Sequence, residues 1–353
     1  MVGDLDYDSL LTTTDPSGSL GWSTSPGHAS KPRVKACFVI LTRNSELAGL
    51  ETSIRQLEQQ FNHRHHYPYV ILNDEPFAPE LERSVRGLTG GANTTFGVIP
   101  QEHWGYPSWI NQTQAADARR RMANVMYGGS ESYRHMCRFE SGFFFRHPLL
   151  AEFDYYWRVE PGVQFTCAID YDPFVFMHER DIKYGFTISL KEIPATVESL
   201  WPATLDYMRQ NRAMVPIDNT LAWVVDPDIP STYNLCHFWS NFEIASLAFF
   251  RSEQYLSYFN HLDRAGGFYY ERWGDAPVHS LAATMFLRRD QIHWFQDIGY
   301  VHASYENCPS DPVINSEKCT CNPRRSVDRV SFSCTREFMH LTPEDRLDVD
   351  GLL

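Results

Sequence analysis

The sequence lacks an excess of positive charge. Its 353 residues include 44 Asp and Glu against 31 Lys and Arg, which gives a formal net charge of −13 at pH 7. A protein that binds the nucleic acid backbone needs a basic field that attracts phosphates. We therefore expect no nucleic acid partner, and an anionic small substrate would have to be bound by local arginines or by a metal ion.

Long apolar runs are missing as well. No segment has the length of a transmembrane helix, and no apolar signal region opens the chain. Residues 1–32 are polar and rich in Ser, Thr, Gly, Asp and Pro, so we expect a disordered lead-in or the remnant of a stem. Attachment to a membrane would then require an anchor that is absent from this sequence.

The eight cysteines lack the C-x-x-C pairs that are typical of zinc sites. Four of them lie in the C-terminal part of the chain: Cys308, Cys319, Cys321 and Cys334. Disulfides are the better interpretation of these four, and zinc is a minor alternative. Sequons at Asn93 and Asn111 are candidate glycosylation sites. Both features fit an oxidising, glycosylating lumen.

What is present is the composition of a folded globule, with 43% apolar and 21% charged residues. The first hundred residues alternate between strand and helix patterns. Nearly continuous apolar runs cover 34–41, 69–73 and 96–99, and apolar residues recur at helical spacing over 47–61. This order predicts a doubly wound α/β sheet. The pattern continues with further predicted strands at 153–160 and 183–190 and predicted helices at 114–126, 131–147 and 194–211.

Glu160 occupies a position suited to a ligand of a divalent cation. It ends the aromatic segment 153–160 and precedes a Pro-Gly turn. Ligands of open α/β sheets bind at the carboxyl ends of strands, and carboxylates bind divalent cations. The alternative is an ordinary carboxylate in a turn. Two more polar clusters occur downstream, at residues 272–277 and 299–302.

Residues 233–243, YNLCHFWSNFE, concentrate polar and aromatic side chains in a chain that is 14% aromatic overall. Such a mixture is typical of a sugar site, because aromatic faces pack on sugar C–H groups and polar groups bind hydroxyls. We expect His237, Trp239 and Asn241 to form its rim. A buried hydrogen-bonded network is an equally good interpretation of the same residues.

Several strings occur in a recognisable order: YGGSESYRHMCRFESGFFFRHPLL, YYWRVEPGV, YGFTISLKE, YNLCHFWSNFEIA, GGFYYERWGDAPVHSLA and DIGYVHASYENCP. In these strings the chain resembles the fungal α-1,2-mannosyltransferases of glycosyltransferase family 15, from about residue 35 to residue 335. The resemblance implies a GT-A fold, a single Rossmann-like domain at 33–335 with a mixed sheet flanked by helices, followed by a C-terminal tail at 336–353. It also implies GDP-mannose as donor, a mannose-terminated glycan as acceptor, Mn²⁺ as cofactor and residence in the Golgi lumen.

The resemblance also assigns roles to residues. It implies that Glu160, in an E-P-G string that replaces the usual D-x-D motif, and His302, in a G-Y-x-H string, bind the metal. The matching family positions near the donor are Tyr133, Arg158 and, after the first strand, Arg43. The family's active-site acids correspond to Glu243 and Asp275, and Tyr133 joins them as a catalytic candidate.

An α-linked donor and an α-linked product imply retention of configuration. Retention requires either a covalent intermediate, with Glu243 as nucleophile, or departure and attack on one face, with Glu243 stabilising the oxocarbenium ion. Two other classes of protein remain as alternatives. A glycoside hydrolase would use the same carboxylates, and a mannose-binding lectin would keep the aromatic rim and show no turnover.

Overall fold

The computed structural model describes residues 34–229, 231–342, 345–347 and 349. The predicted lead-in at 1–32 and part of the predicted tail therefore lie outside the described residues. Among the helices of the described part, none combines the length and apolar character that a membrane span requires.

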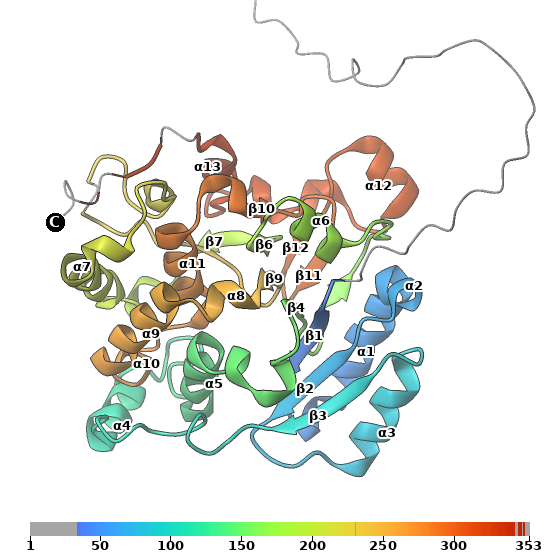
Figure 1. Cartoon of the computed structure of the whole chain (residues 1–353), viewed down its shortest axis with the longest axis horizontal. Coiled ribbons are helices and arrows are strands. Elements are labelled where there is room, and N and C mark those ends of the chain that lie inside the picture. The colour runs from blue at the N-terminus through green and yellow to red at the C-terminus, as the bar shows by residue number, and fades with distance from the viewer. Residues whose placement is uncertain (1–33, 230, 343–344, 348, 350–353) are drawn as a thin grey trace, which may run out of the picture. The chain divides into compact units, whose positions relative to one another are not determined.

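A seven-stranded mixed sheet with the order β10-β6-β9-β4-β1-β2-β3 forms the centre of the fold (Figure 1). Neighbouring strands are parallel except at β9, which runs antiparallel to both β4 and β6. The strands are β1 Ala36–Leu41, β2 Tyr69–Asn73, β3 Thr94–Val98, β4 Tyr155–Arg158, β6 Tyr184–Phe186, β9 Glu243–Ser246 and β10 Ile292–Trp294. The predicted mixed α/β fold is confirmed, and the predicted strand at 153–160 lies in the middle of the sheet.

The sheet is buried on both faces, which explains the continuous apolar runs of the N-terminal strands. Side chains alternate between the faces along each strand. In β1, Cys37 and Val39 contribute to one hydrophobic core, whereas Phe38 and Ile40 contribute to the other. The two cores therefore lie on opposite faces of the sheet.

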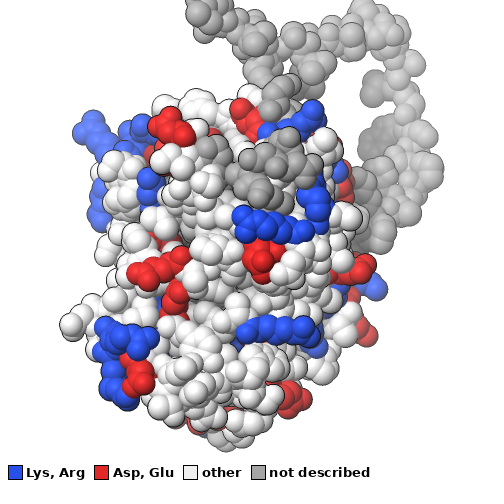
Figure 2. Space-filling model, turned by 90° about the vertical axis from the view of Figure 1, so that its left-hand side faces the viewer, with Lys and Arg blue, Asp and Glu red and all other residues white. Residues whose placement is uncertain are grey.

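Each core is closed by its own set of helices. One face is covered by α1 Leu47–Leu57, α3 Pro79–Leu88 and α6 Pro173–Glu179. The other face carries α4 Gln112–Arg121, α5 Glu131–Gly142, α7 Leu200–Gln210, α9 Glu253–Ala265, α10 Gly267–Tyr270 and α11 Asp275–Phe286. The remaining α-helices of the described part are α2 His63–His65, α8 Leu247–Phe250, α12 Pro312–Lys318 and α13 Thr335–His340. Figure 2 shows that Lys and Arg lie beside Asp and Glu in small groups on one face of the molecule.

Two small sheets complete the described part. One has the order β12-β11-β5 and consists of β5 Gln164–Phe165, β11 Tyr300–His302 and β12 Tyr305–Asn307, and the other pairs β7 Ser189–Lys191 with β8 Cys236–Phe238. The prediction of a single strand at 183–190 is wrong, because β6 joins the main sheet while β7 leaves it to pair with β8. The predicted helix 131–147 also ends early, at Gly142, and a 3-10 turn follows it before Pro148.

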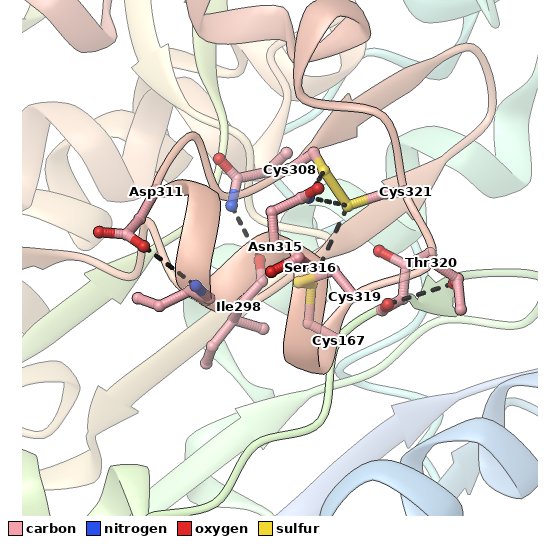
Figure 3. Close-up of a disulfide and its surroundings, with 12 residues drawn as sticks. Cys167, Ile298, Cys308, Asp311, Asn315, Ser316, Cys319, Thr320 and Cys321 are labelled. Atoms are coloured by element: carbon pink, nitrogen blue, oxygen red, sulfur yellow. Dashed lines mark hydrogen bonds between the residues drawn. A yellow bond between two sulfur atoms is a disulfide. The ribbon is translucent and has the colours of Figure 1, made fainter.

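Three disulfides connect parts of the chain that are distant in sequence: Cys167–Cys319, Cys236–Cys334 and Cys308–Cys321. Two of them lie next to each other around α12 (Figure 3). All four C-terminal cysteines are thus in disulfides, which leaves no thiolate among them for the alternative zinc site. Their partners include Cys167 and Cys236, which no local pattern in the sequence distinguishes.

The two sequons are accessible. Asn93 and Asn111 are both exposed, and the side chain of Asn111 also caps α4 by accepting hydrogen bonds from two backbone amides. Exposure is compatible with glycosylation, which stays a prediction for both positions.

Candidate active site

Arg158 is the centre of a cluster of charged residues at the end of β4. Its Nη1 lies 2.6 Å from Asp275 Oδ2 and 3.9 Å from Glu140 Oε2, and its Nη2 lies 2.6 Å from Glu160 Oε1. Arg158 is buried. Burial by itself would lower the pKa of the guanidinium, but the surrounding carboxylates Glu140, Asp275 and Glu160 raise the pKa well above its ordinary value. A permanent positive charge is therefore held between three acids.

Asp275 is the first residue of α11, where the helix dipole favours negative charge. Its Oδ2 accepts hydrogen bonds from Arg158 and, at 2.7 Å, from the hydroxyl of Ser240. Burial raises the pKa of Asp275, but the nearby Arg158 and His279 outweigh burial and hold the pKa below its ordinary value. Asp275 is thus a buried carboxylate that stays ionised.

Glu243 lies directly opposite Arg158, in the register of β4 with β9. Its side chain is completely buried. Tyr156 and Tyr184 each donate a hydroxyl hydrogen bond to its carboxylate, and His279 Nδ1 lies 2.9 Å from Oε2. The structure therefore assigns Glu243 to the buried network that the sequence analysis had left open as the alternative.

His279 links this network to α5. Its second ring nitrogen, Nε2, lies 3.1 Å from the backbone oxygen of Glu140. Burial lowers the pKa of His279, but Glu243 and Asp275 outweigh burial and raise the pKa above its ordinary value. Both ring nitrogens face acceptors, which suits a protonated imidazole.

Glu140 has the opposite electrostatic character to Asp275. Burial raises the pKa of Glu140 to about 7, although Arg158 opposes the shift. The cluster therefore contains one carboxyl group that titrates near neutral pH beside another that stays ionised.

Glu160 and His302 are positioned by two different strands. Tyr300 and Val301 of β11 pair with Phe165 and Gln164 of β5, so the strand that contains His302 runs beside the strand that follows Glu160. The intervening turn contains Gly162 with φ of 87°, a conformation that favours glycine. The side chain of Glu160 is 27% exposed. His302 Nδ1 is buried without a hydrogen-bond partner in the described part of the chain. The partly exposed carboxylate of Glu160 and the unpartnered imidazole nitrogen of His302 are of the ligand types that bind a transition-metal ion.

Arg43 and Tyr133 lie together at the start of α5. Arg43 Nη2 donates a hydrogen bond of 2.9 Å to Ser132, the neighbour of Tyr133. The ring of Tyr133 stacks on that of Tyr127, with the ring centres 4.5 Å apart. The two predicted donor-binding residues are thus brought to one place although they are far apart in sequence.

The predicted rim of three side chains is not formed as expected. The structure buries His237, which is 2% exposed, and Asn241, whose Oδ1 accepts a hydrogen bond of 2.8 Å from Tyr300. Trp239 is partly exposed, and its ring contacts that of His302 edge to face. Of the three, only Trp239 offers an aromatic surface, and it does so next to the proposed metal ligand.

Residues 13–342 match the family described as glycolipid 2-alpha-mannosyltransferase. The chain belongs to this family. It is 51% identical over 312 residues to glycolipid 2-alpha-mannosyltransferase 1 of Candida albicans. The aligned region covers 88% of this chain and 72% of that protein. It is 50% identical over 313 residues to alpha-1,2 mannosyltransferase KTR1 of Saccharomyces cerevisiae. This alignment covers 88% of this chain and 79% of that protein.

Solved structures agree with the sequence relatives. Core-mannan synthase A of Aspergillus fumigatus, in a Mn/GDP form, superimposes with a TM-score of 0.82 at 41% identity and covers 93% of this chain and 91% of its own. The mannosyltransferase Ktr4p of S. cerevisiae in complex with GDP gives 0.84 at 39% identity, with coverage of 90% and 84%. The predicted family is confirmed, and the chain is a glycosyltransferase.

Several residues of this family member's site were not identified from its sequence. They are Glu140, Tyr156, Tyr184 and His279. Some periodic signals were available. Asp275 and His279 are four residues apart and so share one face of α11, and Tyr156 is two residues before Arg158 on the same face of β4. These spacings become informative only when one member of each pair is already assigned.

Proposed function

We propose that the chain is a retaining α-1,2-mannosyltransferase that transfers mannose from GDP-mannose to a mannose hydroxyl of an O-glycan, N-glycan or glycolipid, in a Mn²⁺-dependent reaction. The observation that carries this proposal is the position of Arg158 at the carboxyl end of β4, where it contacts both Asp275 and the predicted metal ligand Glu160. Relatives named as α-1,2-mannosyltransferases, and similar structures containing GDP or Mn and GDP, support the choice of donor and metal.

Glu160 and His302 would hold the metal ion. When bound, Mn²⁺ supplies positive charge that stabilises the diphosphate as GDP departs. Arg158 keeps Glu160 in place through the hydrogen bond between Nη2 and Oε1. Arg43 and Tyr133, which come together at the start of α5, would bind the donor.

Asp275 is the acid that we assign to the reacting sugar. It is 4% exposed, remains ionised beside Arg158 and is separated from Glu160 by that guanidinium alone. A fixed negative charge at this place would stabilise the positive charge that develops on the mannose ring.

We propose same-face departure and attack in preference to a covalent intermediate, with a diphosphate oxygen accepting the proton of the acceptor hydroxyl. The reason is the state of Glu243. As a nucleophile it would have to give up hydrogen bonds to Tyr156, Tyr184 and His279 and emerge from complete burial. As a buried charge behind Arg158 it stabilises the cluster without moving.

We further propose that the enzyme acts in the Golgi lumen. Three disulfides suit an oxidising compartment, and two exposed sequons suit a glycosylating one. Mass spectrometry of the secreted chain without reduction would test this. We expect both sequons to be occupied and the four C-terminal cysteines to be oxidised, and free thiols at those cysteines would contradict the proposal.

The proposed activity is tested by the release of GDP. The chain is incubated with a panel of sugar nucleotides and with methyl α-mannoside as acceptor, and the product is analysed by NMR. We expect GDP release from GDP-mannose only, and a product with a new α-1,2 linkage. Hydrolysis of mannosides without a nucleotide would indicate a glycoside hydrolase, and binding of mannose without turnover would indicate a lectin.

A further inference from the structure

Two of the three disulfides are in contact with each other. Sγ of Cys167, which is bonded to Cys319, lies 3.9 Å from Sγ of Cys321, which is bonded to Cys308 (Figure 3). The sulfur atoms of Cys167, Cys319 and Cys321 all lie within 4.8 Å of one another. A thiol formed in one of these disulfides would therefore lie against the other disulfide.

The backbone around Cys319 explains why two sulfur atoms lie near Cys167. The two segments run antiparallel, and Cys319 and Cys167 form an isolated bridge between them. Cys319 has extended backbone, in which residues two apart point to the same side. Cys321 is two residues later, so the pairing brings both of its sulfur neighbours, bonded and non-bonded, to Cys167.

The four sulfur atoms differ in accessibility. Cys319 and Cys321 are partly exposed, whereas Cys167 and Cys308 are buried. A dithiol from solution would therefore reach the Cys308–Cys321 bond at Cys321. Asn315 on α12 donates a hydrogen bond of 3.2 Å from Nδ2 to Sγ of Cys308. The same donor would stabilise Cys308 as the departing thiolate, and a stabilised leaving group favours exchange.

The two disulfides close loops of very different length. Cys308 and Cys321 are 13 residues apart, whereas Cys167 and Cys319 are 152 residues apart. Opening the short loop restores little conformational freedom to the unfolded chain. A new bond between Cys167 and Cys321 would keep the long loop closed, so the folded state retains its most constraining link.

We propose that Cys167, Cys308, Cys319 and Cys321 form a thiol–disulfide exchange site that reacts with a dithiol. In the first step the dithiol supplies two electrons and two protons to the Cys308–Cys321 bond and leaves as a disulfide, so that Cys308 and Cys321 become thiols. In the second step the Cys321 thiolate attacks Sγ of Cys167. The Cys167–Cys321 bond forms, the Cys167–Cys319 bond breaks, and Cys319 takes up the proton that Cys321 lost. This second step involves no net oxidation or reduction.

The exchange relocates a covalent link beside the proposed metal ligand. Cys167 follows β5, and β5 pairs with β11, the strand that contains His302. In the oxidised chain this pair of strands is tied to Cys319, the residue directly after α12. After exchange it is tied two residues farther along the chain. The inference does not depend on the proposed transferase activity.

The first test uses Cys308→Ser, which leaves a thiol at Cys321 beside the intact Cys167–Cys319 bond. The variant is incubated at about pH 8, quenched with acid, labelled with N-ethylmaleimide in denaturant and mapped by mass spectrometry. Cys37 and Cys137, which are not in disulfides, are labelled in every sample and serve as the internal standard. We expect one isomer labelled at Cys321 and a second isomer labelled at Cys319 that contains a Cys167–Cys321 bond.

The two isomers of Cys308→Ser should be present in amounts within about tenfold of each other, because one disulfide replaces another between the same chain segments. At about pH 5 the exchange should be roughly a thousandfold slower, since the thiolate fraction falls tenfold for each pH unit. A Cys319–Cys321 bond with a thiol at Cys167 would overturn the assignment of Cys167 as the attacked atom.

A second variant covers the case in which the first does not fold. Cys319→Ser leaves a thiol at Cys167 beside Cys321, and attack on the Cys308–Cys321 bond should release a thiol at Cys308. Exchange in either variant would support the proposal. Labelling of Cys308→Ser at Cys321 alone, together with labelling of Cys319→Ser at Cys167 alone, would refute it.

The matched control is the third disulfide, Cys236–Cys334. Both of its cysteines are buried, and no third cysteine sulfur of the described residues joins it in a cluster. Cys236→Ser should therefore be labelled at Cys334 alone, with the other two disulfides unchanged. Rearranged disulfides in this control would show that exchange occurs through unfolded chains, and the contact between Cys167 and Cys321 would then have no specific role.

The unaltered chain tests the complete reaction. It is treated with an equimolar amount of dithiothreitol, quenched with acid and mapped in the same way. We expect thiols at Cys308 and Cys319, a Cys167–Cys321 bond and an intact Cys236–Cys334 bond. Thiols confined to Cys308 and Cys321 would overturn the second step, because the bond would then be reduced without exchange.

Discussion

The two faces of strand β4 differ in almost every physical respect. On one face, Trp157 packs among aromatic rings of the core, including Phe38 at 5.6 Å and Phe242 at 5.3 Å between ring centres. On the other face, Tyr156 and Arg158 contact Glu243 and the surrounding acids. Consecutive residues of one short strand thus serve hydrophobic packing and electrostatics.

This difference indicates how the enzyme holds so many charges inside the protein. Buried charges are unfavourable unless they are paired and hydrogen-bonded in a rigid frame. The apolar face of β4 supplies that rigidity, and β9 places Glu243 directly opposite Arg158. We therefore expect changes on the apolar face to unfold the protein and changes on the charged face to inactivate a folded one.

The largest effect is expected at the exposed end of the charged face. Glu160→Gln and His302→Ala should each lower turnover by about a thousandfold or more, because the departing diphosphate loses its metal. Chelation of metal ions should abolish transfer in the unaltered enzyme, and Mn²⁺ should restore it better than Ca²⁺, since an imidazole ligand favours transition metals. Turnover measured against metal concentration checks this.

The control for the metal variants is Glu82→Gln, a change at a partly exposed position on α3. It should leave turnover unchanged. Full activity of the unaltered enzyme in excess chelator would remove Glu160 and His302 from the reaction.

The next effect is expected on the apolar face. Trp157→Ala should lower the free energy of unfolding by about 3–5 kcal/mol, as large-to-small substitutions in cores do. Activity should fall only in proportion to the folded fraction. Urea denaturation together with turnover measures both quantities, and Trp157→Phe should show a smaller loss. If the folded Trp157→Ala enzyme were inactive, the two faces would not be separable.

Glu243→Gln tests the charged face of β4 without changing its apolar face. Removal of the negative charge behind Arg158 should lower turnover roughly a hundredfold. Stability should fall as well, because His279 loses its carboxylate partner. Affinity for GDP should change little, since the diphosphate is bound elsewhere. Near-normal turnover of the folded variant would exclude Glu243 from the mechanism and leave Asp275 as the acid to test.

The smallest effect concerns pH. The pKa of Glu140 rises from 4.5 to about 7 on folding, so the folded state binds this proton more tightly. Its contribution to stability is present below pH 4.5 and is lost as the pH rises through 7. Glu140→Gln should remove this pH dependence of the free energy of unfolding. The dependence amounts to about 3 kcal/mol in total.

Urea denaturation between pH 4.5 and 8 measures the effect of Glu140→Gln. The variant should show a flatter profile than the unaltered enzyme. Asp275 acts in the opposite direction, because its lowered pKa makes its contribution disappear as the pH falls. An identical profile for Glu140→Gln would show that Glu140 does not titrate in this range.

The N-terminal half of the fold could be predicted from sequence because its signals are local. Strands β1 and β2 are continuous apolar runs, and α1 has apolar residues at helical spacing. The prediction of a single strand at 183–190 was wrong for the opposite reason, because its pairing depends on residues far away in the sequence. Whether its residues stay in one sheet depends on β8, which lies almost fifty residues later.

The candidate site shows the same division. The motifs with Glu160 and His302 can be found by resemblance, but the pairing of β11, which contains His302, with β5, which follows Glu160, cannot be read from either motif. The string that contains Glu243 suggested a sugar site, yet the carboxylate of Glu243 lies inside the protein. Burial depends on Tyr156, Tyr184 and His279, which come from three other elements.

The sequence by itself determined the α/β class and the family, and it pointed to the acids Glu160, Glu243 and Asp275 and to four of the six cysteines that form disulfides. These follow from local periodicity and from strings of adjacent residues. The tertiary structure alone decided which cysteines pair, which carboxyl group stays ionised and which titrates near neutral pH, and that Glu243 is enclosed while Glu160 is partly exposed. These properties depend on distances between residues far apart in the chain, because charges and hydrogen bonds act through space and local sequence does not record their spacing.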